Sequence, residues 1–276
     1  TNKTGTRYWT FAGFNLIGGG TATGNYSAIE IGGVATPDTN WRVLGNDIKC
    51  PKSATSTGCI FSSADYLVVF GNTIHDMGTD LTPAARNKLF HSLYIGASHI
   101  NVGWNRFYNN YNCRSIQVHF DNHAPFFDLH IFSNTIYNDS CDGINFSNVD
   151  PSQGTVEAYN NVIYRVGTGT LSANYAGRRS ADYNTGTCGC PGSGTIEIYN
   201  NVLYDIGSGG TGGQSSHGAI FKDGTNTNLL LRLRNNIIYQ TNANLTSPVT
   251  TEFYTSSTGL GQISGSNNVW FGLAAA

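Results

Sequence analysis

The sequence predicts an all-β protein built from stacked coils, a β-solenoid, and three observations indicate this fold. A nine-residue segment occurs twice, as YNNVIYRVG at 159–167 and as YNNVLYDIG at 199–207. Residues that favour strands (Val, Ile, Thr, Tyr and Phe) fall in short runs broken by Gly, Asn, Ser and Asp. Charged residues make up only 12% of the chain, about half the usual share, and helix-favouring residues are sparse.

Units related to the repeated segment occur along the whole chain. Each has two short apolar runs joined at a corner, and nine can be aligned: 9–19, 41–50, 67–78, 100–110, 129–139, 159–167, 199–207, 231–241 and 263–272. The corner holds Phe14 in the first unit and Asn in the others: Asn46, Asn72, Asn105, Asn134, Asn161, Asn201, Asn236 and Asn268. The spacing varies from 26 to 40 residues, which is typical of coils with loops of variable length. We expect one domain over 1–276, with a loop insertion at about 167–194.

An Asn repeated at the same height on successive coils predicts a ladder along the solenoid axis. An amide side chain both donates and accepts hydrogen bonds, so buried Asn side chains can bond to one another from coil to coil. Asn also tolerates the left-handed backbone that a sharp corner needs. The repeat is therefore interpreted as architectural, and its flanking residues are expected to line or cap the stack: Val162, Tyr164, Val202, Tyr204, Ile237 and Tyr239.

Most coils carry a further strand outside the repeated unit. The segments are 27–33, 92–98, 115–121, 143–149 and 218–224, and they alternate apolar and polar residues, which marks one buried face. Two or three strands per coil, each paired with its equivalent in the next coil, give parallel sheets that share one core.

With its Asn-containing corner and its inward Ile, Val and Phe residues, the chain resembles the right-handed parallel β-helix proteins of the pectate-lyase-like superfamily, over about residues 8–272. The resemblance implies right-handed coils and a polysaccharide partner bound along the outside of the stack. Many members cleave or epimerise acidic sugars. The related polygalacturonases carry NTD, paired Asp, GHG and RIK motifs, of which only the fragment SHG at 216–218 occurs here, so a hydrolase of that type is not expected.

Calcium-dependent pectate lyases hold their metal with a cluster of Asp or Glu. A calcium site needs several converging oxygen ligands. This sequence has no dense acidic cluster, and Asp121 and Asp142 alone supply few ligands. We therefore expect no cofactor, with calcium as the alternative.

Ionisable side chains of both signs gather on three consecutive coils. If Leu93 and Ile95 and their equivalents face the core, the alternate residues face outward on one sheet. The candidate catalytic residues there are Lys88, His91, Tyr94, Arg114, His119 and Asp142. The candidate substrate-binding residues are Gln117, Asn145, Tyr175, Arg178 and Lys222.

These residue types suit elimination or epimerisation of a uronate. Such chemistry needs a cation at the carboxylate and a base at the C5 proton. Arg114 is the predicted cation, His119 or Lys88 the predicted base, and Tyr94 the predicted proton donor to the leaving oxygen. The purely structural alternative is that His91 bonds to neighbouring backbone and Arg114 simply pairs with Asp142.

Two functions therefore stay open from the sequence. One is a secreted lyase or epimerase acting on acidic glycans. The other is a noncatalytic carbohydrate-binding, adhesive or filament-forming solenoid. End-to-end self-association belongs to the second, because the first unit has no visible polar cap and bare terminal coils expose strand edges.

Charge and hydropathy argue against two other classes of partner. A net charge of −2 and a pI near 6.3 provide no basic face for nucleic acid. No run of about 18 apolar residues predicts a membrane span. Neither nucleic acid nor a membrane is therefore expected as a partner.

Six cysteines without CxxC zinc spacing favour disulfides in an oxidising compartment, and hence a secreted or extracellular protein. Cys113 and Cys141 follow their ladder positions by 8 and 7 residues, so they lie at similar heights on adjacent coils and are predicted to pair. Cys50 with Cys59, and Cys188 with Cys190, are predicted local pairs. Sequons consistent with secretion occur at Asn2, Asn25, Asn138, Asn145 and Asn244.

Overall fold

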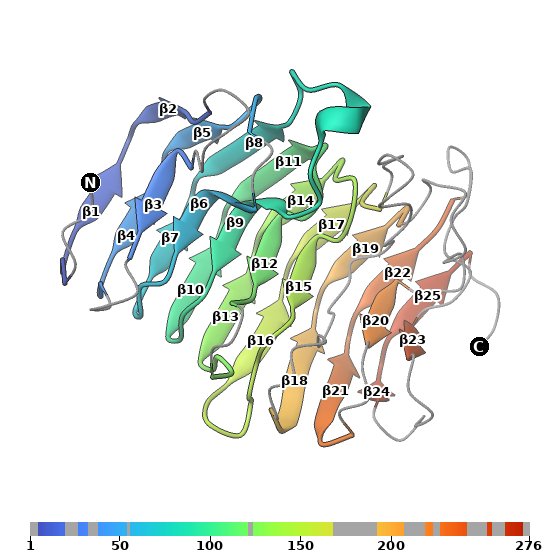
Figure 1. Cartoon of the computed structure of the whole chain (residues 1–276). Helices are drawn as coiled ribbons and strands as arrows, with labels where there is room; N and C mark the ends of the chain where they lie inside the picture. Colours follow the sequence, from blue (N-terminus) through green and yellow to red (C-terminus); the bar gives the residue numbers. More distant parts are fainter. Residues whose placement is uncertain are drawn as a thin grey trace.

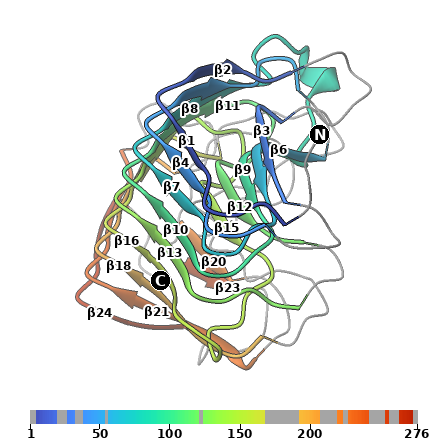
Figure 2. The same ribbon diagram turned by 90° about the vertical axis from the view of Figure 1, so that its left-hand side faces the viewer.

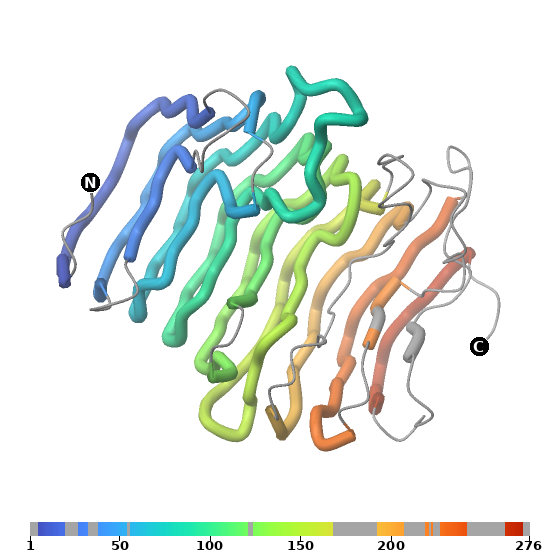
Figure 3. The backbone as a smooth tube through the Cα atoms, viewed as in Figure 1, coloured from blue at the N-terminus to red at the C-terminus, as the bar shows by residue number. Residues whose placement is uncertain are grey.

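A computed structural model of the chain shows a right-handed parallel β-helix whose coils follow one another in sequence order (Figure 1). The all-β solenoid predicted from the sequence is confirmed. The structure describes residues 5–19, 27–32, 38–53, 56–120, 124–167, 192–206, 219–222, 227–241, 253–255 and 263–272. Successive turns of the backbone lie side by side, with β1 and β25 at opposite ends of the stack (Figure 3).

Each aligned unit supplies one strand to each of two long sheets. In the described residues the first sheet contains, in spatial order, β1 (Thr10–Ala12), β4 (Arg42–Leu44), β7 (Val68–Phe70), β10 (Ile100–Gly103), β13 (Leu129–Phe132), β16 (Val156–Tyr159), β18 (Gly194–Tyr199), β21 (Leu229–Arg234) and β24 (Ile263–Ser266). The second sheet contains β2 (Asn15–Ile17), β5 (Asp47–Lys49), β8 (Thr73–Met77), β11 (Arg106–Asn110), β14 (Thr135–Tyr137), β17 (Val162–Tyr164), β19 (Val202–Tyr204), β22 (Ile237–Tyr239) and β25 (Val269–Phe271).

The additional strands form a third, shorter parallel sheet. In the part of the chain that the structure describes, it contains β3 (Ile29–Ile31), β6 (Thr57–Ser62), β9 (Phe90–Ile95), β12 (Ile116–Val118) and β15 (Ile144–Phe146). A 3₁₀ turn, η1 (Pro83–Ala85), precedes β9, and β20 (Ile220–Lys222) pairs with β23 (Phe253–Thr255). The three sheets form the sides of a prism (Figure 2).

The core fills this prism with one column of apolar side chains per inward position. Along the second sheet, for example, Ile74, Phe107, Ile136 and Ile163 are register partners and are fully buried. One coil cannot bury its own apolar face, so stability comes from stacking neighbouring coils.

The corner between the first and second sheets explains why the sequence repeats two asparagines. In YNNVIY, the first amide residue, Asn160, has φ of 55°, and Asn200 has φ of 56° in the second copy. Asn161 and Asn201 follow them and form the ladder. The prediction that the ladder Asn itself adopts the left-handed backbone is therefore wrong: the residue before it does, and elsewhere this residue is Gly, Asn, Trp104 or Ser133.

The predicted Asn ladder is confirmed, with all of its side chains buried except the half-buried Asn268. From Asn72 onward, the Oδ1 atom of each ladder Asn accepts two hydrogen bonds, from the backbone N and the Nδ2 of the ladder Asn one coil earlier. For Asn161 these donors belong to Asn134, at 3.0 and 3.1 Å. Each Nδ2 also donates to a strand carbonyl, as from Asn161 to Ile131 O at 2.9 Å. The line starts where the backbone N of Phe14 donates to Asn46, and it ends at the half-buried Asn268.

The residues that flank the ladder face outward and not into the core. Ile163, between Val162 and Tyr164, is the inward residue, while Val162 is 39% exposed. The expectation that the flanking residues line the inside of the stack is therefore wrong, because their side chains point outward. The tyrosines stack on one another along the outside, as for Tyr137 on Tyr164, with ring centroids 4.8 Å apart. Their ring faces are thereby occupied by neighbouring rings.

Two of the three predicted disulfides are confirmed. Cys113 joins Cys141 across adjacent coils with a Cα separation of 4.6 Å, and Cys50 joins Cys59. Cys188 and Cys190 lie outside the described residues. The two disulfides indicate an oxidising, extracellular environment. No described helix is long and apolar enough to cross a bilayer.

Large apolar side chains are exposed on the first and last aligned units. Phe14 and Ile17 are 50% and 67% exposed, and Val269 and Phe271 are 59% and 65% exposed. End-to-end self-association stays a prediction, and measurement of the molecular mass in solution over a range of concentrations tests it.

Candidate functional site

The candidate site lies on the outer side of β9, β12 and β15, which we call the third-sheet face. Its members form two rows across three coils. Tyr94, Gln117 and Asn145 are register partners in one row. His91, Arg114 and Asp142 form the other, three residues earlier on each coil, since the backbone continues the same register.

The row of His91, Arg114 and Asp142 is dominated by a buried ion pair. Arg114 Nε donates to Asp142 Oδ2 at 2.6 Å, and the two side chains are 8% and 0% exposed. The predicted structural pairing of these residues is therefore present. A buried pair of this kind is costly to break from one side, about 3–5 kcal/mol, because the remaining charge stays desolvated.

The row of Tyr94, Gln117 and Asn145 holds two amides linked through a hydroxyl. Gln117 Nε2 donates to Ser147 Oγ at 2.8 Å, and Ser147 Oγ donates to Asn145 Oδ1. Gln117 is 4% exposed and Asn145 is fully buried. The link uses one polar atom of each amide, and the other atom of each, Gln117 Oε1 and Asn145 Nδ2, has no hydrogen-bond partner in the described part of the chain.

His91 lies at the junction of the two rows. It is 3% exposed, and its ring centroid is 5.5 Å from that of Tyr94. Burial, and then the charges of Arg114 and His119, lower the pKa of His91 well below its ordinary value. The imidazole is therefore neutral at physiological pH, the state in which it accepts a proton.

Four buried polar atoms on this face lack a partner among the described residues. They are His91 Nδ1, Gln117 Oε1, Asp142 Oδ1 and Asn145 Nδ2. An unsatisfied buried polar group costs about 1–3 kcal/mol, so four on three neighbouring coils call for a ligand or ordered water. The set offers one donor, two acceptors and an imidazole nitrogen that serves as either, which suits ligand hydroxyl groups.

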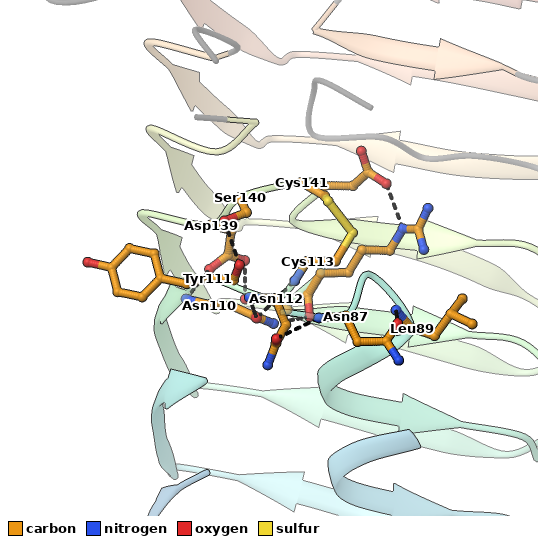
Figure 4. Close-up of a disulfide and its surroundings, with 12 residues drawn as sticks. Asn87, Leu89, Asn110, Tyr111, Asn112, Cys113, Asp139, Ser140 and Cys141 are labelled. Carbon is orange, nitrogen blue, oxygen red and sulfur yellow. Dashed lines mark hydrogen bonds and ion pairs between the residues drawn. A yellow bond between two sulfur atoms is a disulfide. The ribbon is translucent and has the colours of Figure 1, made fainter. Parts of the chain in front are cut away.

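A buried polar layer that was not predicted from the sequence holds residues 113–115, which lead into β12 (Figure 4). Asn110 Nδ2 donates to Arg114 O at 2.5 Å, and its Oδ1 accepts from the backbone N of Cys113 at 3.1 Å. Asp139 accepts from Asn110 N and from Ser115 Oγ. Asn110 and Asp139 both lie five residues after a ladder Asn, and this equal offset is the signal that could have identified them.

Burial of Asp139 raises its pKa well above the ordinary value, an effect that outweighs its hydrogen bonds from Ser115 and Asn110. The nearby Asp142 carboxylate raises the pKa further. The carboxyl group therefore resists ionisation where it lies, to one side of the Cys113–Cys141 disulfide (Figure 4).

The structure brings most of the predicted site residues together. His91, Tyr94, Arg114, Gln117, His119, Asp142 and Asn145 share the third-sheet face, with His119 and Tyr94 ring centroids 6.4 Å apart. Lys88 is half-buried between η1 and β9. Lys222 is fully buried on β20, whose described pairing is with β23 and not with β15. Tyr175, Arg178 and Asp121 lie outside the described residues.

Two of the predicted sequons fall within the described chain. Asn138 is half-buried, and its Nδ2 donates to Asn109 Oδ1 at 3.4 Å. Asn145 is fully buried on the third-sheet face. Glycosylation of either stays a prediction, and Asn2, Asn25 and Asn244 lie outside the described residues.

The described residues do not assemble a calcium centre. No group of three or more His, Cys, Asp or Glu side chains in the described part of the chain could hold a metal ion. One carboxylate oxygen of Asp142 already accepts a hydrogen bond from Arg114. The residues on the third-sheet face thus do not fit calcium, and no step below is derived through a metal.

No protein-family model, curated protein or solved structure matches this chain.

Proposed function

We propose that the third-sheet face binds an acidic sugar unit of a polysaccharide and that the protein acts on it as a lyase or epimerase. The observation that carries the proposal is the set of four unpartnered buried polar atoms around a neutral imidazole and an arginine. Sugar hydroxyls both donate and accept hydrogen bonds, so they match this mixed set better than a purely anionic or cationic ligand does.

The arrangement of side chains suits removal of the proton at C5 of a uronate. His91 Nδ1 takes the proton, and the electron pair of the C–H bond enters an enediolate whose charge the guanidinium of Arg114 stabilises. In elimination, the C4–C5 double bond forms, the C4–O bond breaks, and the Tyr94 hydroxyl protonates the leaving oxygen. In epimerisation, the same intermediate takes a proton from solvent at C5 on the opposite face, and His91 releases its proton to solvent.

We assign the base to His91, and not to His119 or Lys88, the two residues favoured from the sequence. His91 is held neutral by burial and by Arg114, and its Nδ1 atom has no partner among the described residues. His119 lies beside Tyr94, with ring centroids 6.4 Å apart, and under this proposal it contacts the substrate.

A noncatalytic carbohydrate-binding function is the second candidate, and one observation favours it. Arg114 already binds Asp142, with both side chains buried. Because Asp142 neutralises part of the charge of Arg114, the pair would then have a structural role and shape a surface that binds sugar without reacting with it.

Incubation with pectate and alginate distinguishes the two candidates. The ultraviolet absorbance of the unsaturated product reports elimination, and proton NMR reports inversion at C5. Under the proposal, His91→Gln lowers turnover by at least about 100-fold, the scale of a general base. His75→Gln is the matched control, because His75 lies on the outer side of the second sheet, next to Asp47 and Asp76.

Retained turnover in His91→Gln contradicts the assignment of the base. Binding of a uronan without turnover by the wild type supports the second candidate. Absence of both binding and turnover on all uronans contradicts the proposal as a whole.

A further inference from the structure

A groove of about 400 Å³ lies on another side of the molecule, along the N-terminal end of the first sheet. It is lined by side chains from β1, β4, β7 and β10, from the corners before these strands and from the corner before β13: Tyr8, Thr10, Asn40, Arg42, Tyr66, Val68, His99, Asn101 and Asp128. These strands lie side by side in chain order (Figure 1). The volume is within the range of small-ligand pockets.

One wall of the groove is a column of corner residues that share the left-handed backbone. Tyr8, Asn40, Tyr66 and His99 have φ between 59° and 61°. Backbone hydrogen bonds place them at one height on successive coils: Tyr8 N donates to Thr39 O at 3.2 Å, and Asn40 N to Asp65 O at 3.0 Å. The column therefore reads ring, amide, ring, ring along the axis.

Asn40 interrupts an aromatic stack. Tyr66 and His99 are stacked with ring centroids 4.4 Å apart and planes 3° apart. Neighbouring coils are about 4.8 Å apart, so Tyr8 and Tyr66, which are two coils apart, are separated by the space of one further ring. Tyr8 and Tyr66 are 78% and 52% exposed. In the tyrosine columns elsewhere on the molecule, stacked neighbours fill the equivalent space.

Polar groups face the same space. Arg42, two residues after Asn40, is exposed, and its guanidinium has no ion-pair or hydrogen-bond partner among the described residues. Asp128, at the other end, is held by His99 Nδ1 at 2.7 Å and His130 Nε2 at 3.0 Å. We call the space over Asn40, between Tyr8 and Tyr66, the slot. The guanidinium of Arg42, unpaired among the described residues, therefore lies at the slot, whereas the Asp128 carboxylate is already bound by two histidines.

We propose that this groove is a second carbohydrate site, in which one acidic pyranose ring inserts over Asn40 between Tyr8 and Tyr66 with its acid group on Arg42. Aromatic faces pack against the apolar C–H faces of a sugar ring, and an arginine binds a carboxylate with two parallel hydrogen bonds. The site is separate from the third-sheet face and does not rest on the catalytic proposal.

The substitution Asn40→Tyr tests the proposal, because it places a ring of the protein in the slot where the sugar would bind. Asn40→Tyr completes the stack, and the backbone accepts it because Tyr8 and Tyr66 hold the same φ. Binding is measured by calorimetry with trigalacturonate, with cellotriose as the neutral comparison and phenol as the flat aromatic comparison. The protein carries Asn145→Leu throughout, so that binding at the third-sheet face is impaired.

We expect trigalacturonate to bind, and Asn40→Tyr and Tyr66→Ala each to raise its Kd at least about tenfold. Arg42→Gln removes the preference for trigalacturonate over cellotriose. Tyr239→Ala is the matched control, because its ring lies between Tyr204 and Phe271, and it leaves the Kd unchanged.

Three results overturn the proposal. Trigalacturonate binding that survives Asn40→Tyr in a folded protein places the ligand elsewhere. If the protein with Arg42 intact binds cellotriose as tightly as trigalacturonate, the site does not select acidic sugars. Tighter binding of phenol than of either sugar assigns the slot to planar aromatic ligands.

Discussion

Asn161 on the ladder and Asn145 on the third-sheet face are the same residue with the same complete burial, yet their hydrogen bonding differs. Asn161 Oδ1 accepts two bonds and its Nδ2 donates two. Asn145 accepts one bond from Ser147, and its Nδ2 has no partner in the described chain. A buried amide that is fully bonded stabilises the fold, while one that is half bonded at a cost in stability points to a ligand.

The largest expected effect comes from breaking the ladder. Asn161→Leu leaves the backbone N and the Nδ2 of Asn134, the Ile131 carbonyl and Asn201 Oδ1 each short of a partner. Each unsatisfied buried group costs about 1–3 kcal/mol, so we expect the free energy of unfolding to fall by an amount on the order of 5 kcal/mol. Urea unfolding followed by circular dichroism measures it. A loss below about 1 kcal/mol would show that the ladder is not a stabilising element.

The next effect tests the covalent tie beside the third-sheet face. The Cys113–Cys141 disulfide closes a separation of 28 residues, and Cys50–Cys59 closes one of 9. Loop-closure entropy predicts a loss of about 3–4 kcal/mol for the double Ala variant of the first pair and about 2–3 kcal/mol for the second. The same unfolding measurement ranks them. The reverse order would mean that native-state packing, and not the unfolded chain, sets the cost.

Asn145→Leu repeats the ladder substitution at the contrasting position. It removes one hydrogen bond and one unpartnered polar atom, so the two effects nearly cancel and stability changes by no more than about 1 kcal/mol. Under the proposed function, uronan binding at the third-sheet face is weakened, whereas in Asn161→Leu it is unchanged below the unfolding transition. A loss as large as that of Asn161→Leu would make Asn145 a second structural amide.

The smallest effect concerns pH. The folded-state pKa of His91 lies below its unfolded value of about 6.5, so the unfolded chain binds more protons as pH falls below that value, and stability is lost there. Asp139 acts in the opposite direction: its folded-state pKa is raised, so its contribution is lost as pH rises above about 4.

His91→Gln therefore removes the loss of stability as pH falls below about 6.5, and Asp139→Asn removes the opposite loss as pH rises above about 4. Thermal unfolding from pH 4 to pH 8 follows both. Asn161→Leu removes no titratable group and serves as the control that shifts the profile without changing its shape. An unchanged acid slope in His91→Gln would mean that His91 is not buried in the neutral state.

Much of the fold was predicted from sequence because a solenoid is specified by local repetition. Each corner Asn, each inward Ile or Val and the Cys113–Cys141 pair could be placed by counting from the previous coil, since equivalent positions stack directly. The gathering of His91, Arg114 and Asp142 followed from the same count. The left-handed residue before each ladder Asn was misplaced by one position, because composition does not show which of two asparagines turns the corner.

The architecture, the ladder and the strands that carry the third-sheet face follow from the amino-acid pattern, because the coil period and the alternation of apolar and polar residues are local properties of the chain. How the polar groups are used depends on the folded arrangement of the coils. The pairing of Arg114 with Asp142, the neutral state of His91 and the unpartnered atoms of Gln117 and Asn145 depend on burial and on contacts between coils. The slot at Asn40 likewise exists only because stacking aligns that residue between two tyrosines that lie far from it in sequence.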